Sequence, residues 1–167
     1  MPASKFQPAL YGGLLLGVLS ALPIVGAGNL CCCLWVIAGG VVAAYVLQNN
    51  QPTPISLGDG AVVGLLAGLI GAVLWQAIAV PIALVLGPLQ ARVVERVLSN
   101  ASDLPENVRP LLDMLRESSA GGGLMLLGII LGLMFKLVIA GIFSTVGGLI
   151  GAAIFAKKPA AGANDGL

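Results

Sequence analysis

The chain has 167 residues, of which 58% are apolar and only 9% are charged. Soluble domains carry about 25% charged residues, so the composition excludes an ordinary soluble protein. Several continuous apolar runs exceed the roughly 20 residues of one membrane-spanning helix, and these runs predict an all-α membrane protein. The net charge of +1, without a large basic patch, argues against a nucleic-acid partner. The sequence contains no histidine, which removes the commonest general base and metal ligand.

The first apolar run extends from Ala9 to Leu47 and is about twice as long as one transmembrane helix. Gly26-Ala27-Gly28-Asn29 is typical of a turn and divides the run. The sequence therefore predicts a helical hairpin with spans at about 9–25 and 30–47.

The same N-terminal stretch also has features of a cleavable signal peptide, because Lys5 precedes the apolar residues. Gly17 and Pro23 interrupt the apolar region that such a peptide requires. This interruption favours a retained first span over cleavage.

A loop rich in Pro, Asn and Gly follows at Gln48–Gly60, and Asp59 within it is placed to cap the next helix. A third span is predicted at about 61–89, with a kink at Pro81. The hydrophilic segment 90–119 then holds four arginines and five acidic residues.

In this hydrophilic segment, apolar residues recur at i, i+4, so the third helix is expected to continue beyond the membrane as an amphipathic extension. A break is expected at Ser99–Asn107, followed by a second short helix at Val108–Ser118 with Asn107 as its N-cap. The segment is predicted to form a short amphipathic extramembrane helical hairpin.

The last apolar run, 121–156, corresponds to about 54 Å of helix against a hydrocarbon core of about 30 Å. One interpretation is a single tilted helix with Lys136 near the interface and Leu137–Ala156 in the membrane. The other is a deep span at Gly123–Phe143 with a break at Gly147-Gly148. The basic residues at both ends of Leu137–Ala156 favour the first. A polar tail, 157–167, ends the sequence.

The expected fold is a four-transmembrane-helix bundle forming a single membrane domain in the cytoplasmic (inner) membrane. Lys157-Lys158 directly follows the last span, so both termini are expected on the cytoplasmic side.

Small residues recur at every fourth position in three of the predicted spans, a spacing that lets helix backbones approach closely in a bilayer. The candidate packing residues are Gly13, Gly17, Gly64, Gly68, Gly128, Gly132, Ser144 and Gly148.

Lys136 falls in the same four-residue series, and a charge at such a depth requires a partner, a wet cavity or a route to the interface. Gln76 is the candidate hydrogen-bond partner, and the pair is the candidate intramembrane polar site. The alternative is a lysine that extends to the lipid headgroups.

Three adjacent cysteines, Cys31-Cys32-Cys33, point about 100° apart on a helix, so they do not converge on one metal ion. A packing role is the favoured interpretation; an intermolecular disulfide, lipidation and cofactor contact remain open. No cofactor is predicted, although contact with lipid or a pigment is compatible with the composition.

The stretches Ser20–Pro23, Gly28-Asn29, Cys31–Trp35 and Gly58–Gly64 resemble a group of small bacterial four-helix membrane proteins of uncharacterised function. The resemblance covers the first two-thirds of the chain. It implies a bacterial origin and four spans, and it implies no activity, site or ligand.

No nucleophile–base pair, phosphate loop or metal cluster is present in the sequence, so an enzyme is not expected. The leading hypothesis is a non-catalytic self-associating scaffold, or an accessory subunit of a larger membrane complex, in contact with lipid and other membrane helices. The alternative is a small channel or transporter that uses Lys136 and Gln76.

Overall fold

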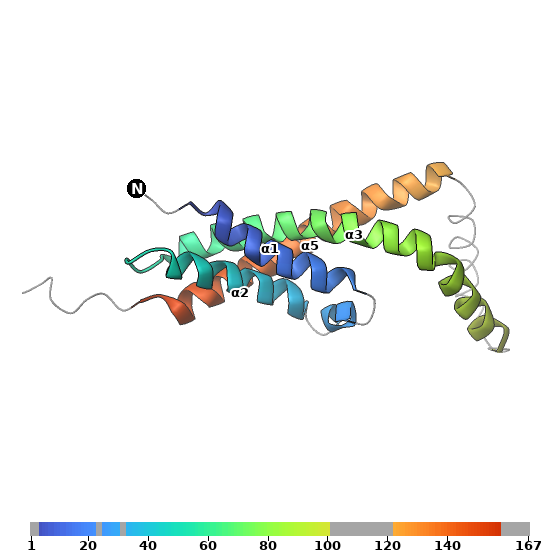
Figure 1. The fold of residues 1–167 in the computed structure, drawn as a ribbon, viewed down its shortest axis with the longest axis horizontal. Helices are drawn as coiled ribbons and strands as arrows, with labels where there is room; N and C mark the ends of the chain where they lie inside the picture. The colour runs from blue at the N-terminus through green and yellow to red at the C-terminus, as the bar shows by residue number, and fades with distance from the viewer. Residues whose placement is uncertain (1–3, 23–24, 31–32, 101–121, 158–167) are drawn as a thin grey trace, which may run out of the picture. The chain divides into compact units, whose positions relative to one another are not determined.

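The computed structural model describes residues 4–22, 25–30, 33–100 and 122–157. Over these ranges the protein is all-helical, with four α-helices and no strand, which confirms the predicted all-α class. A 3₁₀ helix, η1, connects the first two α-helices (Figure 1). The elements in chain order are α1 (Phe6–Ala21), η1 (Val25–Leu30), α2 (Leu34–Asn49), α3 (Leu57–Asn100) and α5 (Gly122–Phe155).

The N-terminus of α3 is fixed by a capping box at Ser56 and Asp59. The Asp59 amide donates to Ser56 Oγ (3.0 Å), while the Ser56 amide and hydroxyl donate to Asp59 Oδ2 (3.2 and 2.8 Å). This reciprocal pattern satisfies amides that have no partner within the helix. As a result α3 begins at Leu57, four residues earlier than the predicted span.

Helix α3 then continues through Pro81 to Asn100, and the helix therefore extends beyond the predicted third span. Arg92 and Arg96 on this extension are exposed. The predicted short helix Val108–Ser118 lies outside the described residues, as does most of the 157–167 tail.

Helix α5 is continuous through Gly147 and Gly148, so the break considered at these glycines is not observed. Most of the 121–156 segment is therefore one long helix, Gly122–Phe155. Two helical stretches, Leu57–Leu86 and Leu126–Phe155, are long and apolar enough to cross a membrane, whereas α1 and α2 are shorter apolar helices of 16 residues each.

The chain divides into two compact units, 1–78 with 136–167 (unit 1) and 79–135 (unit 2). In unit 1 the four helices lie side by side (Figure 1). Glycine contacts give their directions: α1 is antiparallel to α2 and parallel to α3, while α5 is antiparallel to α3 and parallel to α2. Unit 1 is therefore an up-down-up-down four-helix bundle.

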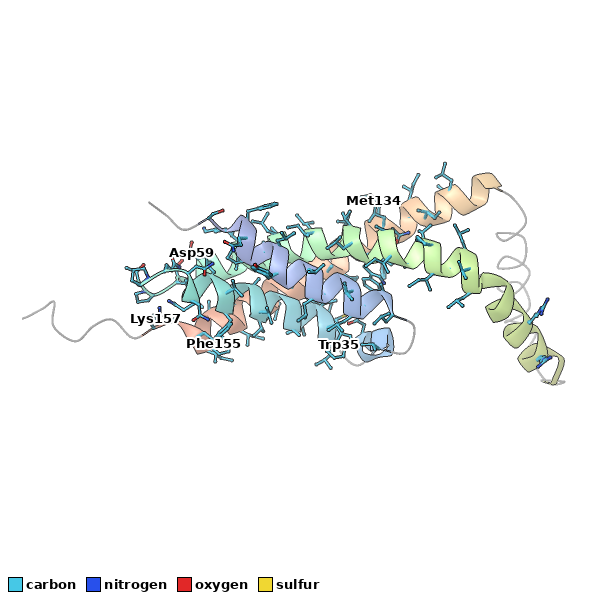
Figure 2. The ribbon with its side chains drawn as sticks, viewed as in Figure 1. Trp35, Asp59, Met134, Phe155 and Lys157 are labelled. Carbon is cyan, nitrogen blue, oxygen red and sulfur yellow. The ribbon has the colours of Figure 1, made fainter. Side chains whose placement is uncertain are left out.

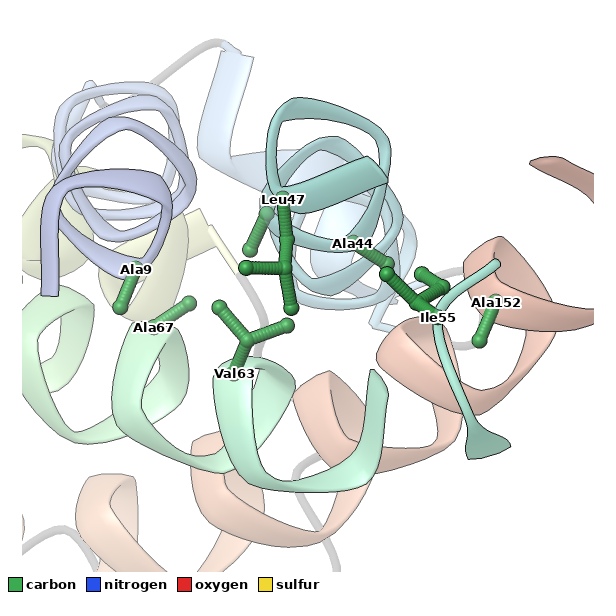
Figure 3. Packing of buried hydrophobic residues seen from close by; sticks show 8 residues of the cluster. Ala9, Ala44, Leu47, Ile55, Val63, Ala67 and Ala152 are labelled. Atoms are coloured by element: carbon green, nitrogen blue, oxygen red, sulfur yellow. The ribbon is translucent and has the colours of Figure 1, made fainter. Parts of the chain in front are cut away.

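The interior of unit 1 is built mainly from small residues, and its large apolar side chains point outward. Leu47, Ile55 and Val63 are the large apolar members of one buried cluster, which otherwise consists of alanines (Figure 3). Large apolar side chains on all four helices are instead exposed: Leu10, Leu14, Leu34, Tyr45, Val62, Leu65, Val73, Val138, Ile142 and Ile154. This distribution is the reverse of that in a water-soluble bundle.

Candidate functional site

Helices α3 and α5 of unit 1 meet along a line of small residues, which we call the small-residue seam. A Cβ atom built at Gly64 would overlap the carbonyl oxygen of Ser144, and one built at Gly68 would overlap that of Ala140. One built at Gly60 would lie 2.5 Å from the Gly148 carbonyl oxygen. Only glycine allows the two backbones to approach this closely.

Ser144 ties the seam together with a hydrogen bond. Its side chain is fully buried, and Oγ donates to the Gly64 carbonyl oxygen at 2.7 Å. The hydroxyl of Thr145, one residue along, instead donates to Gly141 within its own helix (2.6 Å). Ser144 thus allows close packing and also links α5 to α3 through a hydrogen bond, so its buried hydroxyl has a partner.

The seam ends at Lys136, in the same four-residue series as Ala140 and Ser144. Lys136 Nζ donates a 2.6 Å hydrogen bond to Gln76 Oε1 and lies 4.9 Å from the centroid of the Trp75 ring. All three side chains are partly buried. The structure thus places the two predicted polar residues in contact and adds Trp75 to them; we call these three residues the polar site.

Helix geometry explains why these residues meet. In the antiparallel register of the seam, Gly68 faces Ala140, so equal steps along the two helices put Lys136 at the level of Ala72. Gln76 lies one turn further along α3, a rise of about 6 Å, and the long side chains of Lys136 and Gln76 span this rise to form their hydrogen bond. Trp75 was not predicted as part of the site. The signal that could have found it is its place next to Gln76, since an aromatic face attracts a nearby ammonium group.

The opposite end of unit 1 carries a second set of polar contacts. Lys5 Nζ lies 2.7 Å from Asp59 Oδ1, with both side chains about one-third exposed. Asp59 and Lys157 are found at the same end of the bundle, and Trp35 is at the other (Figure 2). Lys157 Nζ donates to the Gln51 carbonyl oxygen (3.0 Å).

Gln48 is a buried polar side chain at this end that the sequence pattern did not indicate as part of a site. Its Oε1 accepts from the amides of Ile55 (2.9 Å) and Lys157 (3.3 Å), and its Nε2 donates to the Thr53 carbonyl (3.1 Å). Gln48 therefore joins the end of α2, the 50–56 connection and the end of α5. In the sequence it is simply the first polar residue after an apolar run.

Near η1, polar contacts link α1 and α2. Asn29 Nδ2 donates to Ser20 Oγ (2.8 Å), its Oδ1 accepts from the Trp35 amide (3.2 Å), and Trp35 Nε1 donates to the Val25 carbonyl (2.6 Å). The predicted turn is therefore a compact cap. Cys33 follows it in the left-handed conformation (φ 53°), whereas Cys31 and Cys32 lie outside the described residues.

The candidate packing glycines fall into two groups. Gly13 and Gly17 of α1 pack on α3, where an added Cβ would lie 2.9 Å from the Ala67 carbonyl oxygen and 2.7 Å from Leu74 Cβ. Gly64, Gly68, Ser144 and Gly148 form the seam. Gly128 and Gly132 differ, because among the described residues no atom lies within 4 Å of a Cβ built at either position.

The described part of the chain contains no group of three or more His, Cys, Asp or Glu residues that could hold a metal ion. What the polar site offers is an ammonium group on an aromatic face, held by an amide. This arrangement can bind or pass an anion or anchor a helix end. No family model, no curated protein and no solved structure matches the chain, so the resemblance to the bacterial group stays a prediction.

Proposed function

We propose that the protein is a multi-pass membrane protein of the cytoplasmic membrane, with four spans, cytoplasmic termini and no catalytic activity. It acts as a self-associating scaffold or as an accessory subunit of a larger complex. Two candidate spans and the outward-facing large apolar side chains of unit 1 support the membrane location. Lipid is the solvent in which such an exterior is stable.

The four-span arrangement is supported by the register of unit 1. The short helices α1 and α2 correspond to about 24 Å each. Through glycine contacts, α1 lies alongside the apolar part of α3 and α2 lies alongside that of α5. The loops and η1 add length at the ends of these helices. A hairpin packed in this way against two spanning helices would cross the same hydrocarbon layer.

The observation that carries the scaffold or subunit proposal is the contrast between the two groups of glycines. The candidate packing glycines of unit 1 already contact other helices of the same chain closely, so they are not free to bind a second chain. Gly128 and Gly132 in unit 2 are open over the described residues, and their neighbours on α5 are large exposed apolar side chains: Leu126, Leu127, Ile130 and Leu131. An exposed apolar face on which glycines let a second backbone approach closely would associate with a helix of another chain.

Gentle extraction from native membranes, followed by native mass spectrometry and an absorbance scan, tests this proposal. Wild-type protein is expected to migrate as a homo-oligomer or with other subunits, and Gly128→Leu combined with Gly132→Leu is expected to abolish that association. Gly58→Leu is the matched control, because a Cβ at Gly58 meets nothing nearer than Ser56 Oγ at 3.6 Å. A wild-type monomer without any co-purifying chain would refute the proposal.

The second candidate function is a small channel or transporter, favoured by the contact between Lys136 and Gln76 in the bundle. It predicts that Lys136→Met abolishes flux in proteoliposomes while Lys136→Arg retains it. Unchanged flux in the methionine variant, with helical content preserved, would eliminate this candidate.

A further inference from the structure

We propose that Lys136, Trp75 and Gln76 form a binding site for the headgroup phosphate of an anionic phospholipid, at one boundary of the hydrocarbon layer. The inference rests on the proposed membrane location of unit 1 and goes beyond the scaffold role. It does not depend on which chain meets Gly128 and Gly132.

The first argument is the spacing of polar groups along unit 1. From Lys136 to Lys157 the helical rise is about 31 Å, and from Asp59 to Gln76 it is about 26 Å. The hydrocarbon core of a bilayer is about 30 Å thick. If the end marked by Asp59 and Lys157 lies at one interface, the polar site therefore lies at the other.

The second argument is charge balance. Among the described residues of unit 1, Asp59 is the sole carboxylate, and it is paired with Lys5 at 2.7 Å at the far end of the bundle. Gln76 provides Lys136 with a neutral acceptor, which cannot balance an ammonium charge. An ammonium in the middle of a bilayer is unfavourable unless it is paired or reaches water. A lipid phosphate provides the missing negative charge when the site lies at the interface.

The third argument is the geometry of the three side chains. A lysine ammonium has three hydrogen-bond donors, and the 2.6 Å bond to Gln76 uses one of them while fixing the direction of the side chain. Trp75 covers one side of the ammonium at 4.9 Å, and tryptophan rings favour the headgroup level of a membrane. Lys136 is only partly buried, so its remaining donors can reach a phosphate oxygen.

Tryptophan fluorescence tests the depth of the site, because Trp35 and Trp75 are the two tryptophans of the chain. The protein is reconstituted in phosphatidylcholine vesicles whose acyl chains are brominated either close to the headgroup or near the chain ends. In the Trp35→Phe variant, Trp75 emission is expected to be quenched more strongly by the shallow bromines. Stronger quenching by the deep bromines would overturn the inference.

The wild-type protein gives the same test without any substitution, because Trp35, like the polar site, lies at the end of the bundle opposite Asp59 and Lys157 (Figure 2). Shallow quenching supports the inference and deep quenching overturns it. Failure of the protein to insert into the vesicles at all would refute the proposed membrane location instead. The two failures are therefore distinguishable.

Lipid titration tests the ligand. Phosphatidylglycerol is added in a non-ionic detergent to the Trp35→Phe variant and to the double variant Trp35→Phe, Lys136→Met, and Trp75 emission is followed. The variant that keeps Lys136 is expected to bind the lipid with about fivefold higher affinity, because one lysine near an anionic surface contributes about that factor. Lys136→Arg, which keeps the charge, is expected to restore binding. Equal affinity with and without Lys136, or an equal response to inorganic phosphate, would overturn the assignment to a lipid phosphate.

Discussion

Substitution of Gly64 by alanine is expected to destabilise unit 1 by about 1–3 kcal/mol. The new methyl group would overlap the Ser144 carbonyl oxygen and lie 3.0 Å from Gly148 Cα. Both are backbone atoms, so α3 and α5 must separate rather than repack a side chain, and such overpacking costs about 1–3 kcal/mol. Separation also weakens the 2.7 Å bond from Ser144 to Gly64, worth about 0.6 kcal/mol in a membrane bundle. The better helix propensity of alanine offsets about 0.5–1 kcal/mol.

The measurement is the free energy of unfolding in mixed micelles, obtained by titration with a denaturing detergent and followed by far-ultraviolet circular dichroism. Gly132→Ala is the matched control, because it adds the same methyl group to a helical glycine without a neighbour within 4 Å among the described residues. The control is expected to be unchanged or up to about 1 kcal/mol more stable. If Gly64→Ala is as stable as Gly132→Ala, the inference that α3 and α5 approach closely at Gly64 is refuted.

Two further substitutions test the polar end of unit 1 that carries Asp59 and Lys157. Gln48→Leu leaves the buried Ile55 amide without its 2.9 Å acceptor, so the free energy of unfolding is expected to fall by about 1–3 kcal/mol and the 50–56 connection to be cleaved faster in limited proteolysis. Proteolysis at the wild-type rate would contradict this role of Gln48. Lys5→Gln removes the ion pair with Asp59, whose side chains are about one-third exposed, so the loss is expected to stay below about 1 kcal/mol. This loss should shrink as sodium chloride is added, and a loss independent of salt would show that the pair does not stabilise the fold through its charges.

The sequence by itself determined the properties that depend on local pattern. A low charged fraction and long apolar runs predicted an all-α protein, and α3 and α5 are indeed long apolar helices. The i, i+4 spacing marked Ser144 and Gly148 as packing residues and put Lys136 in the same series, because helical periodicity is fixed by the backbone alone. Gln76 could be proposed as its partner because polar residues inside the predicted spans are so few.

The tertiary structure decided which helices meet and at what register. Every small-xxx-small stretch has the same local pattern, so the sequence does not distinguish Gly64 from Gly128. Gly64 packs against Ser144 of a helix distant in sequence, whereas no atom of the described residues lies within 4 Å of a Cβ built at Gly128. The hydrogen bonds of Gln48 likewise depend on the end of α5 reaching the end of α2. Such contacts join segments far apart in the chain, and only the close approach of their backbones selects them.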